Sequence, residues 1–154
     1  MYQLVSTVPF RYPEEHACEA FLSSCMDWRY PDEFEKFVQG VLKIETFDHV
    51  KLPGSARAIV DCDINDPDDP VTDALELSIR KHSASITVII NHADCGKEGG
   101  RKNFKDRESE RNHHISLLRG AKTKIESKYD NVTVILVYAD LTEDKCYIEF
   151  NLVD

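Results

Sequence analysis

The run at residues 85–91, SITVIIN, is the feature that most constrains what this chain can fold into. Its residues are mostly β-branched or apolar at successive positions, so both faces of the extended segment would be buried. Strands buried on both faces are typical of the centre of a parallel sheet, because crossover helices cover the two sides of such a sheet. The run therefore predicts an α/β fold with a mainly parallel central sheet.

Predicted strands and helices alternate in the first half of the chain. Residues 18–24 predict a strand, and a helix is expected to open at Pro31. A weaker strand is expected around residues 46–50, followed by a turn at 52–55 and an apolar stretch at 56–60. After an acidic loop, Pro70 is expected to open another helix. The apolar stripes of the two helices are Phe34, Phe37, Val38, Val41 and Leu42, and Ala74, Leu75, Ile79 and His82.

The second half predicts a long helix and then a hairpin. Residues 96–114 are charged, and the inner stripe of the helix starts only at Ile115 and continues to Ile125. Strands at 131–139 and 145–150 are separated by a short turn, which predicts an antiparallel hairpin at the sheet's edge. The 154 residues suit one domain covering residues 1–154, with flanking helices on the sheet.

Composition excludes several classes of protein. The 42% hydrophobic and 31% charged residues are typical of a globular chain. A formal charge of −9 disfavours nucleic acid or a membrane surface as a partner, because both are anionic. With neither an apolar run of membrane-spanning length nor a leader-like start, the protein is expected to be cytoplasmic. Its five scattered cysteines are expected to be reduced thiols.

Residues able to bind a metal follow two of the predicted strands. Cys25 directly follows the first predicted strand, and His92 and Cys95 follow the SITVIIN strand. Thiolates and an imidazole are ligands that zinc prefers, and three protein ligands leave a fourth position for water. Parallel strands end at the same edge of a sheet about 4.8 Å apart, so neighbouring strand ends could hold one ion. The pattern predicts a catalytic zinc site.

Asp27 and Arg29 lie beside the first of these cysteines. In an extended chain, residues two apart face the same side, so both would lie on the side of Cys25. A guanidinium next to a carboxylate keeps the carboxylate ionised and oriented. Trp28 would point the other way, toward the core or an interface.

The patterns Cys25-x-Asp27-x-Arg29 and His92-x-x-Cys95-Gly, the second after a β-branched strand, resemble the β-class carbonic anhydrases. The resemblance implies that Cys25, His92 and Cys95 hold one Zn²⁺ per chain, with Asp27 and Arg29 as a catalytic dyad. The implied reaction is the reversible hydration of carbon dioxide to bicarbonate. Because the chain is short and aromatic residues lie near the site, we expect a homodimer, or a higher even oligomer, that completes the pocket.

Three alternatives remain open at this point. The same ligands could hold a structural zinc in a non-catalytic binding module. A related zinc enzyme could hydrolyse carbonyl sulfide or carbon disulfide. Alternatively, Cys95 and Arg101 fit the C-x5-R pattern of cysteine phosphatases, in which backbone amides and an arginine bind phosphate. The phosphatase hypothesis and the zinc hypothesis exclude each other, since a metal-bound Cys95 is not a free nucleophile.

No functional role is expected for the remaining histidines and cysteines. Adjacent residues do not share a helix face, so His113 and His114 are interpreted as exposed. Three further histidines have no ligand-like spacing, and the other three cysteines are interpreted as strand fillers. These residues are His16, His49 and His82, and Cys18, Cys62 and Cys146.

Overall fold

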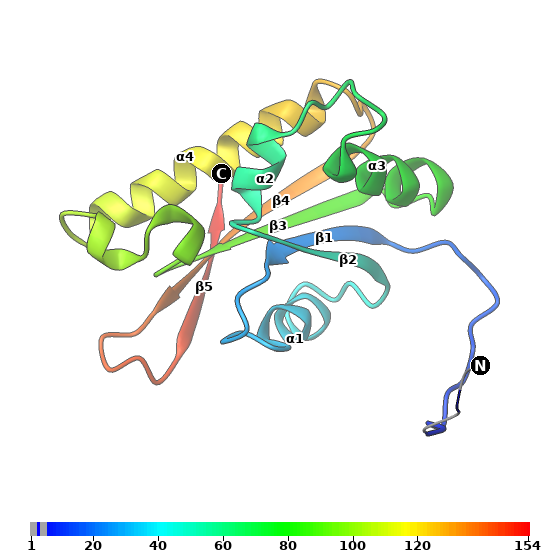
Figure 1. Cartoon of the computed structure of the whole chain (residues 1–154), viewed down its shortest axis with the longest axis horizontal. Coiled ribbons are helices and arrows are strands. Elements are labelled where there is room, and N and C mark those ends of the chain that lie inside the picture. Colours follow the sequence, from blue (N-terminus) through cyan, green and yellow to red (C-terminus); the bar gives the residue numbers. More distant parts are fainter. Residues whose placement is uncertain (1–2, 4–5) are drawn as a thin grey trace.

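The computed structural model describes residue 3 and residues 6–154, and in these residues five strands form one sheet (Figure 1). The order across the sheet is β2, β1, β3, β4, β5, with the first four strands parallel and β5 antiparallel to β4. The strands are β1 (Ala20–Cys25), β2 (Phe47–Leu52), β3 (Ile86–His92), β4 (Thr133–Leu141) and β5 (Ile148–Val153). The predicted α/β class, mainly parallel sheet and C-terminal antiparallel hairpin are confirmed.

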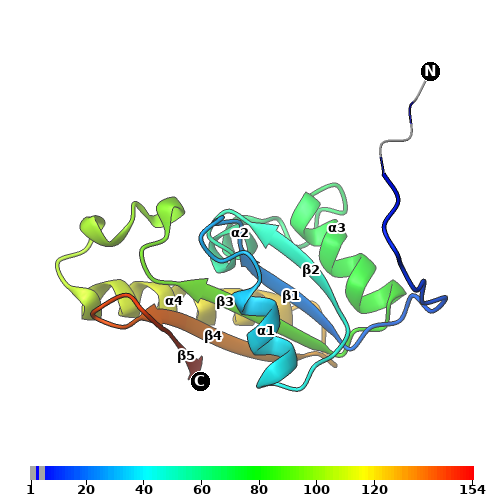
Figure 2. The ribbon, with the colours of Figure 1, turned by 90° about the horizontal axis from the view of Figure 1, so that it is seen from below.

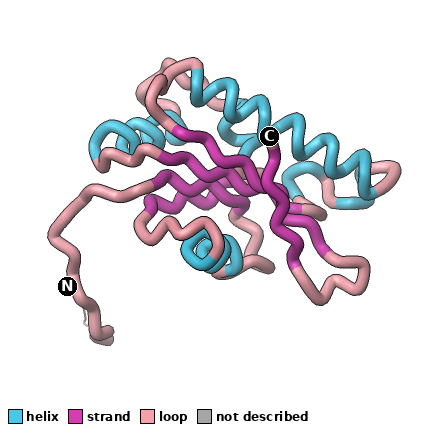
Figure 3. The backbone as a smooth tube through the Cα atoms, turned by 180° about the vertical axis from the view of Figure 1, so that it is seen from behind, coloured by secondary structure: helices cyan, strands magenta, loops and turns pink. Residues whose placement is uncertain are grey.

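Helices cover both faces of the sheet, as the apolar β3 requires. Figures 2 and 3 show α1 on one face and α2, α3 and α4 on the other. Within β3, Val88 and Ile90 face the core under α1, whereas Ile89 faces the core under α2 and α4. The α-helices are α1 (Glu33–Gly40), α2 (Ala56–Asp61), α3 (Pro70–Glu76) and α4 (Arg107–Glu126). Helix α3 continues into the π-helical turn η1 (Leu77–Lys81). Two short 3-10 turns, η2 (Gly96–Glu98) and η3 (Arg101–Asn103), lie between β3 and α4.

Several boundaries differ from those that the sequence predicts. Residues 56–60, expected only as an apolar stretch, belong to the helix α2. The long helix starts at Arg107, well before its apolar stripe, because Asp106 caps it by accepting a hydrogen bond from the Ser109 amide. The last strand starts at Ile148 rather than 145, because residues before it form the hairpin turn.

The register places two strand ends side by side. β1 lies between β2 and β3, and Ser24 is opposite Ile90. Cys25, the last residue of β1, therefore lies at the same edge as His92, the last residue of β3. No helix in the described part of the chain is long and apolar enough to cross a membrane. The expectation about the start of the chain rests partly on residues 1–2 and 4–5, which lie outside the described residues.

Candidate metal centre

The structure brings together the three residues that the sequence predicts as metal ligands. Cys25 and His92 end neighbouring parallel strands, and Cys95 lies in the loop that follows β3. All three are buried, and one ligand atom of each lies within 4.8 Å of the others. The two sulfurs are 3.8 Å apart. Two sulfurs bound to one tetrahedral zinc at about 2.3 Å would be separated by about 3.8 Å, so the pair fits that ion.

The imidazole of His92 is oriented so that its Nε2 atom can bind a metal ion. Its Nδ1 lies 2.8 Å from the carbonyl oxygen of Ala93, which can only accept, so Nδ1 carries the proton. Nε2 then holds the lone pair, and it is buried without a hydrogen-bond partner among the described residues. Buried polar atoms are rarely unpaired in native proteins, and a histidine ligand typically donates its other N–H to a carbonyl. The residues present therefore fit a zinc ion.

The two sulfurs are within hydrogen-bonding distance of each other. The hydrogen bond from Cys95 lowers the pKa of Cys25 to about 4, against the opposing effect of burial, and nearby His92 adds to the lowering. The same hydrogen bond and burial raise the pKa of Cys95. Cys25 is thus the sulfur that loses its proton more readily, and a bound cation would favour the loss of both protons.

Asp27 and Arg29 form the ion pair that the sequence predicts. Arg29 Nε lies 2.9 Å from Asp27 Oδ1, and Arg29 Nη2 lies 2.6 Å from Oδ2, which is a bidentate arrangement. This hydrogen bonding lowers the pKa of Asp27, so the carboxylate stays ionised. Asp27 Oδ2 is also 3.8 Å from the unpaired His92 Nε2. The carboxylate therefore lies beside the ligand cluster but is held by the guanidinium.

Asp94 completes this arrangement, and sequence reasoning missed it. Its carboxylate accepts a hydrogen bond from Arg29 Nη1 at 2.8 Å, and its carbonyl oxygen accepts one from Arg29 Nη2 at 2.9 Å. Asp94 is fixed by its own amide, which donates to Glu110 Oε1, and by the Arg101 amide, which donates to Asp94 Oδ1. The signal available was its place between His92 and Cys95, whereas nothing in the sequence pointed to Glu110.

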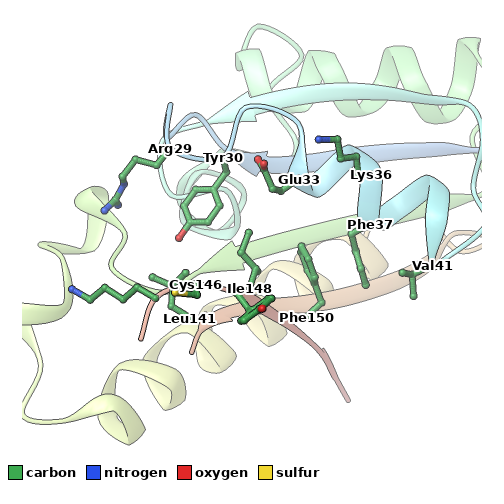
Figure 4. Close-up of a pocket in the computed structure, with 12 residues that line it drawn as sticks. Arg29, Tyr30, Glu33, Lys36, Phe37, Val41, Leu141, Cys146, Ile148 and Phe150 are labelled. Carbon is green, nitrogen blue, oxygen red and sulfur yellow. The ribbon is translucent and has the colours of Figure 1, made fainter. Parts of the chain in front are cut away.

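A cavity of about 550 Å³ opens next to these residues. Cys25, Asp27 and Arg29 line it together with more apolar groups, which include Met26, Trp28 and Pro53. Trp28 is 85% exposed, so the core position considered for it is wrong, because the chain turns away from the sheet directly after β1. A second cavity, of about 690 Å³, lies between α1 and β5, with Tyr30 and Arg29 at one end (Figure 4).

One expectation about the histidines is also wrong. His114 is buried rather than exposed, and its Nδ1 lies 3.2 Å from Asn91 Nδ2. Burial lowers the pKa of His114 to about 4, so its ring is neutral at pH 7. The Asn91 side chain also accepts a hydrogen bond from the Ala56 amide. His114 therefore supports the strand that carries His92.

The geometry opposes the cysteine phosphatase alternative. Arg101 does not surround Cys95, because its guanidinium pairs with Glu110 and Asp140. Cys95 instead faces Cys25, and its raised pKa disfavours a free thiolate nucleophile.

Comparisons with known proteins identify a family and a similar fold. Residues 16–149 match a protein family described as “Putative carbonic anhydrase”. Two uncharacterized proteins, from Rickettsia conorii and Rickettsia bellii, are each 27% identical over 116 residues, which is 73% of this chain. The match spans 62% of the first relative's length and 71% of the second's. The crystal structure of β-carbonic anhydrase isoform I from Trichomonas vaginalis has a similar fold, with a TM-score of 0.55 and 13% identity over 97% of this chain and 87% of the other.

Proposed function

The chain belongs to the carbonic anhydrase family whose profile it matches, and on this basis we propose that it is a zinc enzyme that hydrates carbon dioxide reversibly to bicarbonate. Cys25, His92 and Cys95 would hold one Zn²⁺. The observation that carries this proposal is the buried, unpaired His92 Nε2 close to two sulfurs that are 3.8 Å apart. A zinc ion, when bound, lowers the pKa of water enough to supply a hydroxide nucleophile near neutral pH.

The chain's own residues would orient that nucleophile. Asp27, kept ionised by Arg29, can accept a hydrogen bond from the attacking water, which leaves a lone pair of its oxygen directed at carbon dioxide. Arg29 prevents Asp27 from taking the remaining ligand position, since both carboxylate oxygens accept from the guanidinium. Asp94 holds Arg29 from the other side. Asp27 and Arg29 are therefore the proposed catalytic dyad.

The cavity suits a small uncharged substrate. Met26, Trp28 and Pro53 supply an apolar wall, whereas Asp27, Arg29 and Lys97 supply the polar side. Carbon dioxide fits this chemistry, and carbonyl sulfide and carbon disulfide share its linear shape. Parallel assays with all three molecules distinguish these substrates, and we expect carbon dioxide to give the highest kcat/KM.

The rate of hydration is expected to rise with pH through the neutral and alkaline range. The attacking water must lose a proton before it reacts, and the two thiolate ligands make zinc a weaker acid than three histidines would. The pKa of Asp27 is lowered from its usual value near 3.8, so Asp27 is ionised throughout and contributes no step above pH 5. Stopped-flow rates from pH 6 to 9 should show a single rise. A rate that falls over this range would contradict the proposed nucleophile.

The protein is further proposed to act as a homodimer, or as a higher even oligomer built from it. Trp28 and Met26 are 85% and 61% exposed at the mouth of the cavity, where a second copy would cover them. Trp28→Ala is expected to weaken association by about 30-fold or more, as at an interface hot spot. Leu77→Ala, an exposed apolar residue on η1, is the matched control. Light scattering that shows a fully active monomer at every concentration would contradict the dimer.

A further inference from the structure

A second group of metal-ligating side chains lies at the opposite edge of the sheet. Cys18 precedes β1, Asp48 is the second residue of β2, and His82 follows η1. Asp48 Oδ2 lies 2.8 Å from His82 Nδ1 and 3.4 Å from Cys18 Sγ. One ligand atom of each residue lies within 4.8 Å of the others. Three segments that are distant in the sequence thus converge on one point.

Backbone contacts fix this convergence. The Cys18 amide donates to the carbonyl oxygen of His82 at 3.0 Å. Asp48 is opposite Phe21 in the parallel pairing of β1 with β2. In Figure 1 the start of β1 and the segment after α3 lie on the same side of the molecule. The three side chains are therefore held near one another by the sheet and its connections, rather than by their own flexibility.

The chemistry of the group suits a zinc-type divalent cation. Zinc takes sulfur, nitrogen and carboxylate oxygen ligands in mixed sets. A thiolate, a carboxylate and a neutral imidazole carry two negative charges, which balance the charge of the ion. The ring of His16 lies 5.9 Å from that of His82, centroid to centroid, and is near enough to be a candidate fourth ligand after a side-chain rotation.

The surroundings are acidic as well. Cys18, Asp48 and His16 line a cavity of about 580 Å³, together with Glu15 and Glu45. Among the described residues that line it there is neither lysine nor arginine. Burial and the neighbouring Asp48 carboxylate raise the pKa of the Cys18 thiol, so a cation bound here would have to displace the thiol proton. Local charge therefore favours a cation.

We propose that Cys18, Asp48 and His82 form a second site for a zinc-type divalent cation, separate from the candidate metal centre. Cys18 and Cys25 are seven positions apart in extended chain, or about 23 Å, so an ion here would not touch the reacting atoms. Its role is to tie the segment before β1 to β2 and to the end of η1. The ligands are half-buried, so metal at this site is bound more weakly than at the buried Cys25, His92 and Cys95.

The test uses a chain in which the candidate metal centre is removed. In a Cys25→Ser, Cys95→Ser double variant, titration with Co²⁺ is expected to produce thiolate-to-cobalt absorption that saturates at one equivalent per chain. Adding Cys18→Ser should abolish this absorption, and adding the isosteric Asp48→Asn should weaken binding by about 10-fold or more. Cys146→Ser, which changes an exposed cysteine outside both groups, should leave the titration unchanged.

A second measurement keeps the proposal testable if the double variant does not fold. In the otherwise unmodified chain, saturating Zn²⁺ is expected to give two equivalents per chain, and the Cys18→Ser, Asp48→Asn double variant is expected to give one. Asp48→Asn should leave carbon dioxide hydration unchanged, so failure of this proposal is distinguishable from failure of the proposed activity. Two results would overturn the second site. One is Co²⁺ binding without thiolate-to-cobalt absorption in the folded Cys25→Ser, Cys95→Ser variant. The other is an equal affinity for Co²⁺ with and without the additional change Asp48→Asn.

Discussion

Replacing Arg29 by alanine is expected to slow carbon dioxide hydration by about 100-fold or more while zinc stays bound. The guanidinium holds both oxygens of Asp27, and Asp27 Oδ2 is only 3.8 Å from His92 Nε2. Without Arg29, the carboxylate is free to move into the remaining ligand position and exclude the attacking water. Stopped-flow rates, with zinc measured on the same samples, check this result.

Two further variants separate the parts played by the dyad. Asp27→Asn should also keep the metal and lose a similar factor in rate, because the neutral amide is a weaker hydrogen-bond acceptor for the attacking water than the carboxylate. Arg29→Lys should fall between the unmutated protein and Arg29→Ala, since lysine keeps the charge but not the bidentate geometry. Arg80→Ala, an arginine on η1 that pairs with Glu76, is the matched control and should leave the rate unchanged. If Asp27→Asn and Arg29→Ala both hydrate carbon dioxide at the rate of the unmutated protein, the proposed roles of Asp27 and Arg29 are excluded.

Replacing Cys95 by serine is expected to remove the tightly bound zinc and, with it, the hydration activity. Two of three ligands cannot hold the ion tightly, and the serine hydroxyl stays protonated near neutral pH. The zinc content after dialysis should fall from about one per chain to nearly zero, and Cys25→Ser should behave in the same way. Metal analysis measures this directly, and circular dichroism establishes that the variants are folded.

Cys146→Ser is the matched control for these variants, because it changes an exposed cysteine in the hairpin. It should keep about one zinc per chain and the full hydration rate. Full retention of zinc in both Cys25→Ser and Cys95→Ser would show that these sulfurs do not hold the metal.

Local sequence signals predicted the sheet and placed Cys25 and His92 at neighbouring strand ends. The apolar run of β3 is visible residue by residue, and the candidate ligands lie at or just after strand ends, where parallel strands place functional groups. The start of α4 was hidden, because its first two turns are charged and its N-terminus is capped by two reciprocal hydrogen bonds between Asp106 and Ser109.

Contacts between distant segments explain what the sequence did not predict. The role of Asp94 depends on Arg29, which lies 65 positions earlier, and neither neighbourhood contains a signal of that pairing. His114 is buried because its turn of α4 packs over Asn91, a relation set by tertiary packing. Cys18 was interpreted as a strand filler, and His82 as a histidine without ligand-like spacing, because the two residues meet only at Asp48 of a third segment.

The central claim is that a zinc ion held by Cys25, His92 and Cys95 makes this chain a carbon dioxide hydratase. The most direct measurement is the stopped-flow rate of hydration by protein with one zinc per chain, from pH 6 to 9, beside the same protein after removal of the metal. We expect a rate well above that of buffer, rising with pH and lost when zinc is removed. A folded protein with full zinc that hydrates no carbon dioxide at any pH up to about 9, where the water should have ionised, would contradict the enzyme and favour a structural zinc module.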